Sequence, residues 1–243
     1  MITWVDEVGS TQDLARAQVT RASHLDAFAA RCQTAGRGRL GRTWEAPAGA
    51  CLTITVVLRP SLALSAFPGI TLAAAVATRE VVGPAFRIKW PNDLLAPDGR
   101  KVAGLLAEVE MTTPGPVVLL GLGLNLSAAP PLPTATHLAA WGTAATADDL
   151  APRFVAALGE AVSLLQRDRG ALFDAWRAGW AHRGARVRVG SIEGIAEDID
   201  DDGALRVDGQ RAVAGLCEVL DPVGHGDAPD ARGAVKNEGS PET

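Results

Sequence analysis

The sequence has few cysteines, few lysines and no long apolar run, and each of these absences excludes a class of protein. Its three cysteines fit neither a disulfide framework nor a CxxC metal pair. The longest apolar run, residues 116–126, is far shorter than the ~18 residues of a membrane span. The first ten residues carry no basic residue ahead of an apolar block, so no secretory signal is expected. These absences predict a soluble cytoplasmic protein.

Charge and composition narrow the field further. The chain has 23 Lys and Arg against 28 Asp and Glu, a net charge of −5. A net-acidic chain is a poor non-specific partner for nucleic acid or anionic lipid. Apolar types make up 47% of the 243 residues, which excludes a mostly disordered chain and leaves one or two domains. Only Lys89, Lys101 and Lys236 are lysines, so two of them within one short apolar stretch suggest a specific use.

Strand and helix patterns alternate along the first 183 residues. Strands are expected over residues 2–7, 27–33, 51–58, 86–90, 101–108 and 117–126. Helices are expected from Ser10 or Thr11 onward and over residues 65–82 and 171–181. Another helix is expected over residues 148–166, with Asp148 or Asp149 as its cap.

The chain changes character after Gly184. Short β-type segments over residues 186–189, 194–199, 205–207 and 216–219 alternate with turns, which predicts a small β-barrel. The acidic stretch over residues 193–208 is interpreted as a solvated turn, with steering of an acceptor protein as the alternative. We therefore expect one domain over residues 1–183, a second over 184–222 and a disordered tail over 223–243.

The loop GRGRLGRTW, residues 36–44, is the most informative stretch. Between Arg31 and Glu45, four arginines and one glutamate give a local charge of +3 in a chain of −5. Arginine forks suit phosphate or carboxylate, and glycines let a ligand approach the backbone closely. The loop therefore predicts binding of a small anion, with a structural surface loop or an RG-type nucleic-acid contact as alternatives. It is not a GxxxxGK[ST] loop, because no Lys-Ser or Lys-Thr follows.

Two further clusters carry polar residues beside apolar strands. In KWPND (89–93) and GRKVAG (99–104), Lys101 has the small neighbours Ala103 and Gly104, which leave room for a ligand. An ammonium among apolar neighbours needs an anion, although an exposed strand end would also explain Lys101. Asp93 could hold a metal, orient a base or cap the turn. In GLGLN (121–125), Asn125 either ties down a loop or faces the ligand.

Taken together, these motifs resemble those of biotin–protein ligases. The matching pieces are Ser10-Thr11, GRGRxGRxW, KWPND, GRKxxG and GxGxN, in order over about residues 4–221. The resemblance implies an α+β fold, in which helices back a mixed β-sheet of the biotin/lipoate ligase type and a small SH3-like barrel follows. It also implies that biotin and ATP react to biotinoyl-5′-adenylate, from which biotin passes to a lysine of a carboxylase's biotin carboxyl carrier domain.

The resemblance assigns expected roles residue by residue. The expected catalytic residues are Arg37, Arg39 and Lys101. The expected biotin-binding residues are Ser10, Thr11, Gln33, Gly36, Arg37, Lys101 and Gly104, the first three on the ureido group. The expected ATP-binding residues are Arg37, Arg39, Arg42, Trp44, Asp93 and Asn125. Mg²⁺ is expected mainly on the ATP phosphates, without a dedicated protein cluster.

The sequence departs from the family pattern in two places. Gln12 stands where the family often has Asn after Ser-Thr, so a ureido contact or a helix-cap detail can differ. No helix-turn-helix module precedes residue 4, which favours a form without DNA binding; neither a nucleic-acid nor a membrane partner is expected. The alternative functions are a lipoate–protein ligase-like adenylating enzyme and an arginine-loop nucleic-acid-binding protein. The loop has no histidine, which disfavours the lipoate ligase.

Overall fold

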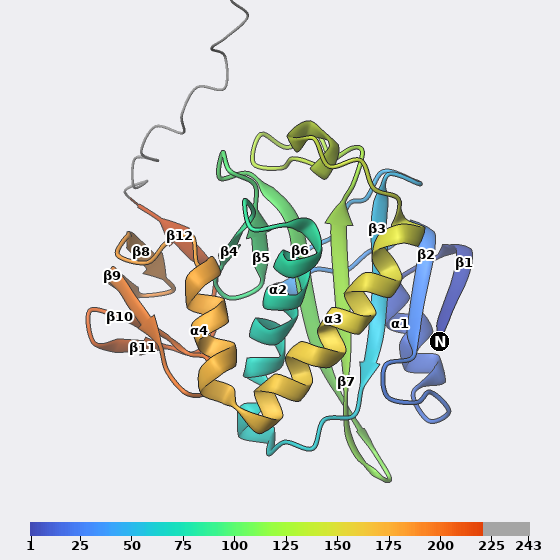
Figure 1. The fold of residues 1–243 in the computed structure, drawn as a ribbon, viewed down its shortest axis with the longest axis horizontal. Helices are drawn as coiled ribbons and strands as arrows, with labels where there is room; N and C mark the ends of the chain where they lie inside the picture. The colour runs from blue at the N-terminus through green and yellow to red at the C-terminus, as the bar shows by residue number, and fades with distance from the viewer. Residues whose placement is uncertain (221–243) are drawn as a thin grey trace, which may run out of the picture.

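The structure, a computed structural model, describes residues 1–220 and contains two β-sheets (Figure 1). The larger sheet has the strand order β1-β2-β3-β7-β6-β5-β4, with β1 and β2 parallel and the other pairs antiparallel. Its strands are β1 (Ile2–Val8), β2 (Ala27–Gln33), β3 (Cys51–Leu58), β4 (Arg87–Lys89), β5 (Asp93–Leu95), β6 (Lys101–Thr112) and β7 (Gly115–Asn125). Each strand expected in this region is present. The short β5, which begins two residues after Pro91, was not predicted.

Helices cover both faces of the larger sheet. Helices α2 (Pro68–Val82) and α3 (Ala147–Arg167) pack on one face, and α4 (Arg169–Gly179) lies beside them toward the second sheet (Figure 1). Helix α1 (Thr11–Gln18) begins after Ser10. The Ser10 side chain accepts a hydrogen bond from the backbone N–H of Gln12, so the expected cap is confirmed. The expected cap of α3 was wrong: Thr146 caps it, in a reciprocal pair of hydrogen bonds with Asp149.

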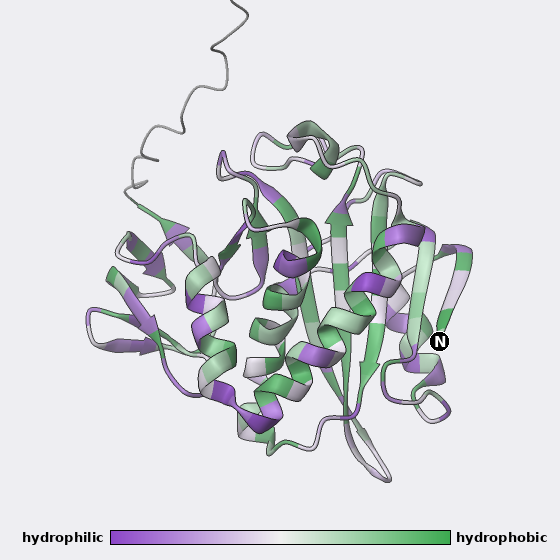
Figure 2. Cartoon of the chain, viewed as in Figure 1, coloured by the Kyte–Doolittle hydropathy of each residue, from purple (hydrophilic) through white to green (hydrophobic). Residues whose placement is uncertain are grey.

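The residues of β3 show why both faces are buried. Leu52, Ile54, Val56 and Leu58 belong to the main core under α2 and α3. Val57 points the other way, into a small core that α1 closes. Because successive side chains alternate between faces, a strand with helices on both sides is buried along its whole length. Figure 2 shows the apolar positions gathered where α2 and α3 meet the sheet.

The second sheet is antiparallel, with the strand order β11-β10-β9-β8-β12. Its strands are β8 (Arg186–Val189), β9 (Ile192–Ile199), β10 (Leu205–Val207), β11 (Gln210–Ala212) and β12 (Cys217–Val219). The predicted fold class is confirmed: a mixed sheet backed by helices, then a small C-terminal β unit. Within residues 1–220 this unit is an open sheet with β11 and β12 at its edges. The unpredicted β11 is short and pairs only with β10.

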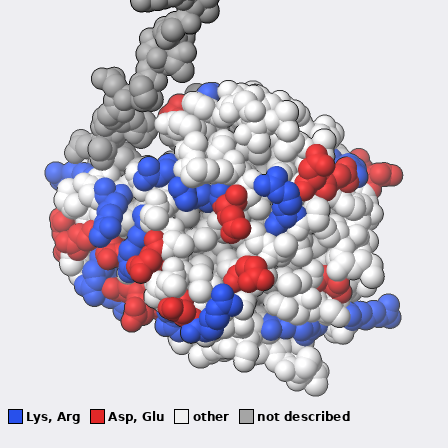
Figure 3. Space-filling view, viewed as in Figure 1, with Lys and Arg blue, Asp and Glu red and all other residues white. Residues whose placement is uncertain are grey.

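The interpretation of residues 193–208 as a solvated turn holds for only part of the stretch, because most of these residues belong to strands β9 and β10 and the turn lies between the two strands. The acidic side chains there pair with arginines: Glu193 with Arg186 and Arg188, and Asp200 with Arg206 and Arg211. Figure 3 shows this mixture of both charges over the C-terminal sheet. The boundaries at residues 183 and 222 stay predictions, and the expected tail over 223–243 lies outside the described residues. None of the helices within residues 1–220 has the length and apolarity needed to cross a bilayer.

Candidate active site

A cleft opens on the α1 side of the larger sheet, under the arginine-glycine loop. The empty space beneath the loop is about 830 Å³, including the open solvent at its mouth. All of the predicted site residues line it except Gly36 and Asn125. Gly215 and Leu216 of the C-terminal unit also contribute to the wall. The structure therefore brings together motifs as far apart in the sequence as Ser10-Thr11 and the GLGLN stretch of residues 121–125.

The floor of the cleft is built from glycines of β6 and β7. Along β7, Val117 and Leu119 pack under α1, and the next residues on the same face are Gly121 and Gly123. Opposite Gly123 on β6 stands Gly104. The side chains of this row therefore stop where α1 no longer covers the sheet. That change from branched residues to glycine makes the cavity.

Trp44 lies across this glycine floor. A Cβ atom at Gly123 would overlap the Trp44 indole, and one at Gly104 would lie 3.1 Å from it. The Lys101 ammonium is 5.5 Å from the centroid of the Trp44 ring, within the range of a cation–π contact. Without side chains at 104 and 123, the indole packs directly on the sheet. An aromatic surface therefore stands beside the cationic groups.

Gly36 has a structural place in the loop instead of a place in the cleft wall. The loop doubles back on itself, with hydrogen bonds from Trp44 N to Gly36 O (2.9 Å) and from Gly38 N to Arg42 O (2.7 Å). A Cβ atom at Gly36 would overlap the Trp44 carbonyl oxygen. The absence of a side chain at 36 therefore allows the two arms of the loop to meet.

Two cations of the cleft have partners that neutralise them to different degrees. Lys101 Nζ lies 2.6 Å from Asp93 Oδ1, an ion pair between β6 and β5. Arg39 Nη1 donates to the neutral amide oxygen of Asn92 at 2.9 Å. Burial lowers the pKa of the Arg39 guanidinium, and the charge of Asp93 partly offsets that effect. Arg39 therefore stands half-buried without a bonded carboxylate, which favours an anionic ligand.

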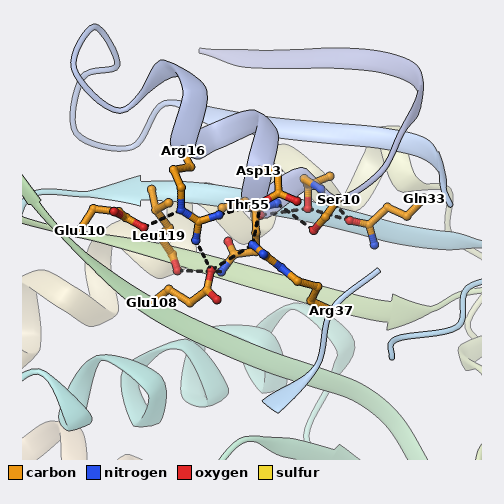
Figure 4. A network of polar contacts seen from close by, with 11 residues as sticks. Ser10, Asp13, Arg16, Gln33, Arg37, Thr55, Glu108, Glu110 and Leu119 are labelled. Atoms are coloured by element: carbon orange, nitrogen blue, oxygen red, sulfur yellow. Dashed lines mark hydrogen bonds and ion pairs between the residues drawn. The ribbon is translucent and has the colours of Figure 1, made fainter. Parts of the chain in front are cut away.

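Arg37 belongs to a network of charges at the other end of the cleft (Figure 4). Its Nη2 atom lies 2.9 Å from Asp13 Oδ1 and 3.4 Å from Glu108 Oε2. Arg16 contacts the same two carboxylates and also Glu110, whose hydrogen bond raises the pKa of Arg16. Arg37 therefore shares its counter-ions with a second arginine, whereas Arg42 lines the cleft and is exposed.

Ser10, Thr11 and Gln33 form a polar end wall where α1 meets β2. Gln33 Oε1 accepts from Thr11 N (2.7 Å) and from Thr11 Oγ1 (3.1 Å). Thr11 Oγ1 in turn accepts from Thr55 Oγ1 at 2.9 Å. These bonds fix the orientation of the Gln33 side chain, and its Oε1 atom accepts both hydrogen bonds from Thr11. Its amide nitrogen has no partner among residues 1–220 and can donate to a ligand.

Asn125 lies outside the cleft wall. Its side chain is 1% exposed and donates to Thr136 O at 2.9 Å. Of the two interpretations from sequence, this geometry favours the one in which Asn125 ties down a loop. Within residues 1–220 no group of three or more His, Cys, Asp or Glu side chains is arranged to hold a metal ion.

Four polar residues of this region were not predicted from sequence as site residues: Gln12, Asp13, Asn92 and Glu108. Asn92 is part of KWPND, so its motif was recognised but its contact with Arg39 was not. Glu108 lies within β6, two residues beyond Leu106 on the same face, and the period of a strand could have pointed to it. Gln12 was singled out from the sequence only as a departure from the family pattern, without an assigned role. Asp13 has no sequence signal of its own, and only the structure shows its contact with Arg37.

Comparison with known proteins gives two family matches. Residues 6–125 match the biotin/lipoate A/B protein ligase family, and residues 184–215 match the biotin protein ligase C terminal domain. A biotin--[acetyl-CoA-carboxylase] ligase of Mycobacterium tuberculosis is 37% identical over 228 residues, covering 86% of this chain and 84% of that protein. One from Paracoccus denitrificans is 39% identical over 214 residues, covering 79% and 88%.

Solved structures show the same fold. The biotin protein ligase from Aquifex aeolicus, in complex with biotin and ATP, superimposes with a TM-score of 0.72 at 23% identity. That match covers 89% of this chain and 97% of the other. The biotin protein ligase from Leishmania major, in complex with biotinyl-5-AMP, has a TM-score of 0.66 at 26% identity, covering 90% and 98%.

Proposed function

The chain belongs to the biotin protein ligase family, and from that membership we propose that its cleft activates biotin with ATP and passes it to a protein. Biotin's carboxylate attacks the α-phosphorus of ATP, the bond to the β,γ-diphosphate breaks, and biotinoyl-5′-adenylate forms. An amine of an acceptor lysine then attacks the acyl carbon, an amide forms and AMP leaves. The acceptor is a biotin carboxyl carrier domain of a carboxylase, in the cytoplasm.

One observation carries the proposal: the arginine-glycine loop and the Lys101 ammonium meet over a single glycine-floored cleft. The first step brings a carboxylate against a triphosphate, so two anions must be held together. Fixed cations in a site partly closed to water lower the cost of that approach. We propose that Lys101 and Arg39 lie on the carboxylate and α-phosphate, and that Arg37 leaves its shared carboxylates to join them.

The remaining residues would bind the two ends of the adenylate. Ser10, Thr11 and Gln33 suit the ureido ring, because the end wall presents hydrogen-bond donors. The floor at Gly104 and the Trp44 indole suit the flat and apolar parts of the ligand. Gly36 would act on biotin only through the shape of the loop. Asn125 would act on the ATP side only through the segment that it ties down.

Mg²⁺ fits this cleft as a companion of the ATP phosphates. Within residues 1–220, Asp93 is the only Asp or Glu that lines the cleft, and its Oδ1 atom is 2.6 Å from Lys101 Nζ. A single shared carboxylate suits Mg²⁺, which keeps waters and phosphate ligands, better than an ion that needs a protein cage. When bound, the ion would reduce the negative charge of the phosphates.

A biotin-transfer assay tests the proposal. The protein is incubated with biotin, ATP, Mg²⁺ and a biotin carboxyl carrier domain, and the carrier is then probed with streptavidin. We expect labelling that requires ATP and the acceptor lysine. Replacing biotin by lipoate and probing for lipoyl-lysine tests the lipoate ligase alternative, which the named relatives do not favour. No biotin label on the carrier, with salt-sensitive binding to DNA or RNA instead, would favour the nucleic-acid alternative.

A further inference from the structure

The polar end of the cleft contains one buried acceptor that the interactions described so far do not use. Gln12 lines the cleft, the residue is 3% exposed, and its Oε1 atom has no hydrogen-bond partner within residues 1–220. A buried amide oxygen without a partner destabilises the folded chain, because the hydrogen bonds it made to water are lost and not replaced. Such a group in a ligand site indicates a partner that the ligand supplies.

The orientation of the Gln12 amide is fixed by its other end. Nε2 donates to Glu108 Oε2 at 3.0 Å and to Leu119 O at 3.3 Å, and both of these atoms only accept. A flipped amide would place its oxygen against a carboxylate and a carbonyl. Arg16 holds Glu108 in turn, through an ion pair of 2.7 Å. The oxygen therefore stays turned away from Glu108.

The carboxamide stands at the glycine floor. A Cβ atom at Gly121 would lie 3.4 Å from Gln12 Cδ and 3.5 Å from Oε1. Gly121 itself lines the cleft. The unpaired oxygen is therefore in contact with the part of the sheet that the ligand would occupy.

The end wall has more free hydrogen-bond donors than free acceptors. Ser10 Oγ accepts from Gln12 N at 3.3 Å, so its hydroxyl hydrogen remains for a ligand, and Gln33 Nε2 remains as a second donor. Gln33 Oε1 already accepts two bonds from Thr11. Gln12 Oε1 accepts none within the described residues. The wall thus offers two donors and one unused buried acceptor.

A ureido group has the complementary set, one carbonyl oxygen and two N–H donors. Resting on the proposed function, we infer that Gln12 Oε1 accepts a hydrogen bond from one ureido N–H of biotin, and that Glu108 is the positioning residue that orients it. The donors of Ser10 and Gln33 remain for the ureido carbonyl. A dithiolane ring, as in lipoate, has no N–H and would leave Gln12 Oε1 unpaired, so the same contact discriminates between the two cofactors.

The test measures biotin affinity by calorimetry without ATP, for the full chain and for Gln12→Met. Met has nearly the same length and no acceptor of comparable strength. We expect the Kd for biotin to rise about tenfold, as when one buried hydrogen bond is lost. Gln18→Met, the same change farther along α1, is the matched control and leaves the Kd unchanged.

Analogues of biotin in which one or the other ureido N–H is replaced by oxygen sharpen the result. For one of the two analogues, Gln12→Met no longer raises the Kd, so the loss from the analogue and the loss from the variant do not add. For the other analogue the tenfold effect of Gln12→Met persists. Full additivity with both analogues would overturn the inference.

Glu108→Gln supplies a second variant with a lower folding risk, because that side chain is 30% exposed. It releases the Gln12 amide, so the difference in Kd between biotin and the sensitive analogue shrinks severalfold. A purely structural role for Glu108 would weaken both ligands equally and would overturn its positioning role. Biotin-dependent exchange of pyrophosphate into ATP is measured beforehand: its absence in the unmodified chain contradicts the proposed function, whereas normal exchange with an unaffected Gln12→Met contradicts only this inference.

Discussion

Arg39 of the cleft and the arginines of the C-terminal sheet carry the same group, but the chain neutralises their charges to different extents. On the C-terminal sheet Arg211 contacts Asp200 and Asp202 at 2.6 Å, and Arg186 contacts Glu193 at 2.9 Å. In the cleft Arg39 donates to an uncharged amide instead. Figure 3 shows the interleaved charges on the C-terminal sheet.

This difference separates two uses of arginine. Exposed ion pairs such as those of Arg211 gain little in free energy, because water screens them and long side chains lose freedom. A half-buried guanidinium with a neutral partner keeps its charge available for an anion, and the low-dielectric surroundings strengthen the interaction. The residue type alone therefore does not identify a binding site. What identifies it is whether the partners of the arginine are charged or neutral, and how many there are.

The largest effect is expected at Lys101. Lys101→Ala removes the cation between the two reacting anions, and we expect biotin-dependent exchange of pyrophosphate into ATP to fall on the order of 10³-fold. The matched control is Lys89→Ala on β4, a lysine that does not line the cleft. Exchange at a near-normal rate in Lys101→Ala would contradict the role proposed for this ammonium.

A smaller effect is expected at Arg39, on retention of the intermediate. Arg39→Gly removes the guanidinium that stands without a carboxylate, and we expect the adenylate to dissociate about a hundredfold faster, because a charge-assisted contact in a partly buried site is lost. Free biotinoyl-AMP in solution, measured by chromatography after rapid filtration, checks this. Arg188→Gly on the C-terminal sheet is the control, and an equal increase there would abolish the comparison.

Much of the fold and most of the site could be predicted from the sequence, because the signals are local. Strands β2 and β3 have the predicted bounds: the glycine-rich loop follows β2 directly, and alternation of Thr with apolar residues identifies β3. The cleft residues lie in short motifs that carry their own chemistry. Convergence of Arg39, Trp44 and Lys101 on one cleft came from the family resemblance, and the spacing of the motifs could not have given it.

The features that were not predicted depend on contacts between different segments of the chain. Strand β5 forms because Asp93–Leu95 pairs with β4 on one side and β6 on the other, and a three-residue strand has no pattern of its own. The interpretation of residues 193–208 did not include their ion pairs, because most of the arginines that neutralise the acidic residues lie on neighbouring strands. Glu108 and Gln12 are 96 residues apart, so no local pattern joins them.

Asn92 offers a direct way to remove the difference between the two regions. Asn92→Asp places a carboxylate against Arg39, as on the C-terminal sheet, and removes the donor that binds Leu105 O at 2.9 Å. We expect the KM for ATP to rise about tenfold, because the guanidinium is then neutralised before the anion arrives. Asp202→Asn is the control in the other region. An unchanged KM in Asn92→Asp would show that the partner of Arg39 does not set its availability.

The smallest effect is expected on the C-terminal sheet, where an ion pair should affect stability and not activity. Arg211→Met should lower Tm by less than about 3 °C at neutral pH and leave pyrophosphate exchange unchanged, since the pairs of Arg211 are largely exposed. Thermal unfolding followed by circular dichroism measures the first quantity. A loss of exchange in this variant would place Arg211 with the cleft arginines.

The Tm difference between the unmodified chain and Arg211→Met should depend on pH, because Asp202 is a partner of Arg211. Its hydrogen bond with Arg211, more than any other contact, lowers the pKa of the Asp202 carboxyl. A carboxyl with a lower pKa in the folded chain stabilises it above the unfolded value, about 3.9, and loses this contribution as the pH falls through the folded value. The Tm difference between the unmodified chain and Arg211→Met should therefore persist at pH 6 and shrink as the pH falls toward 3. A difference that stayed constant down to pH 3 would mean that Arg211 stabilises the sheet by packing alone, because protonation of Asp202 would then not remove its contribution.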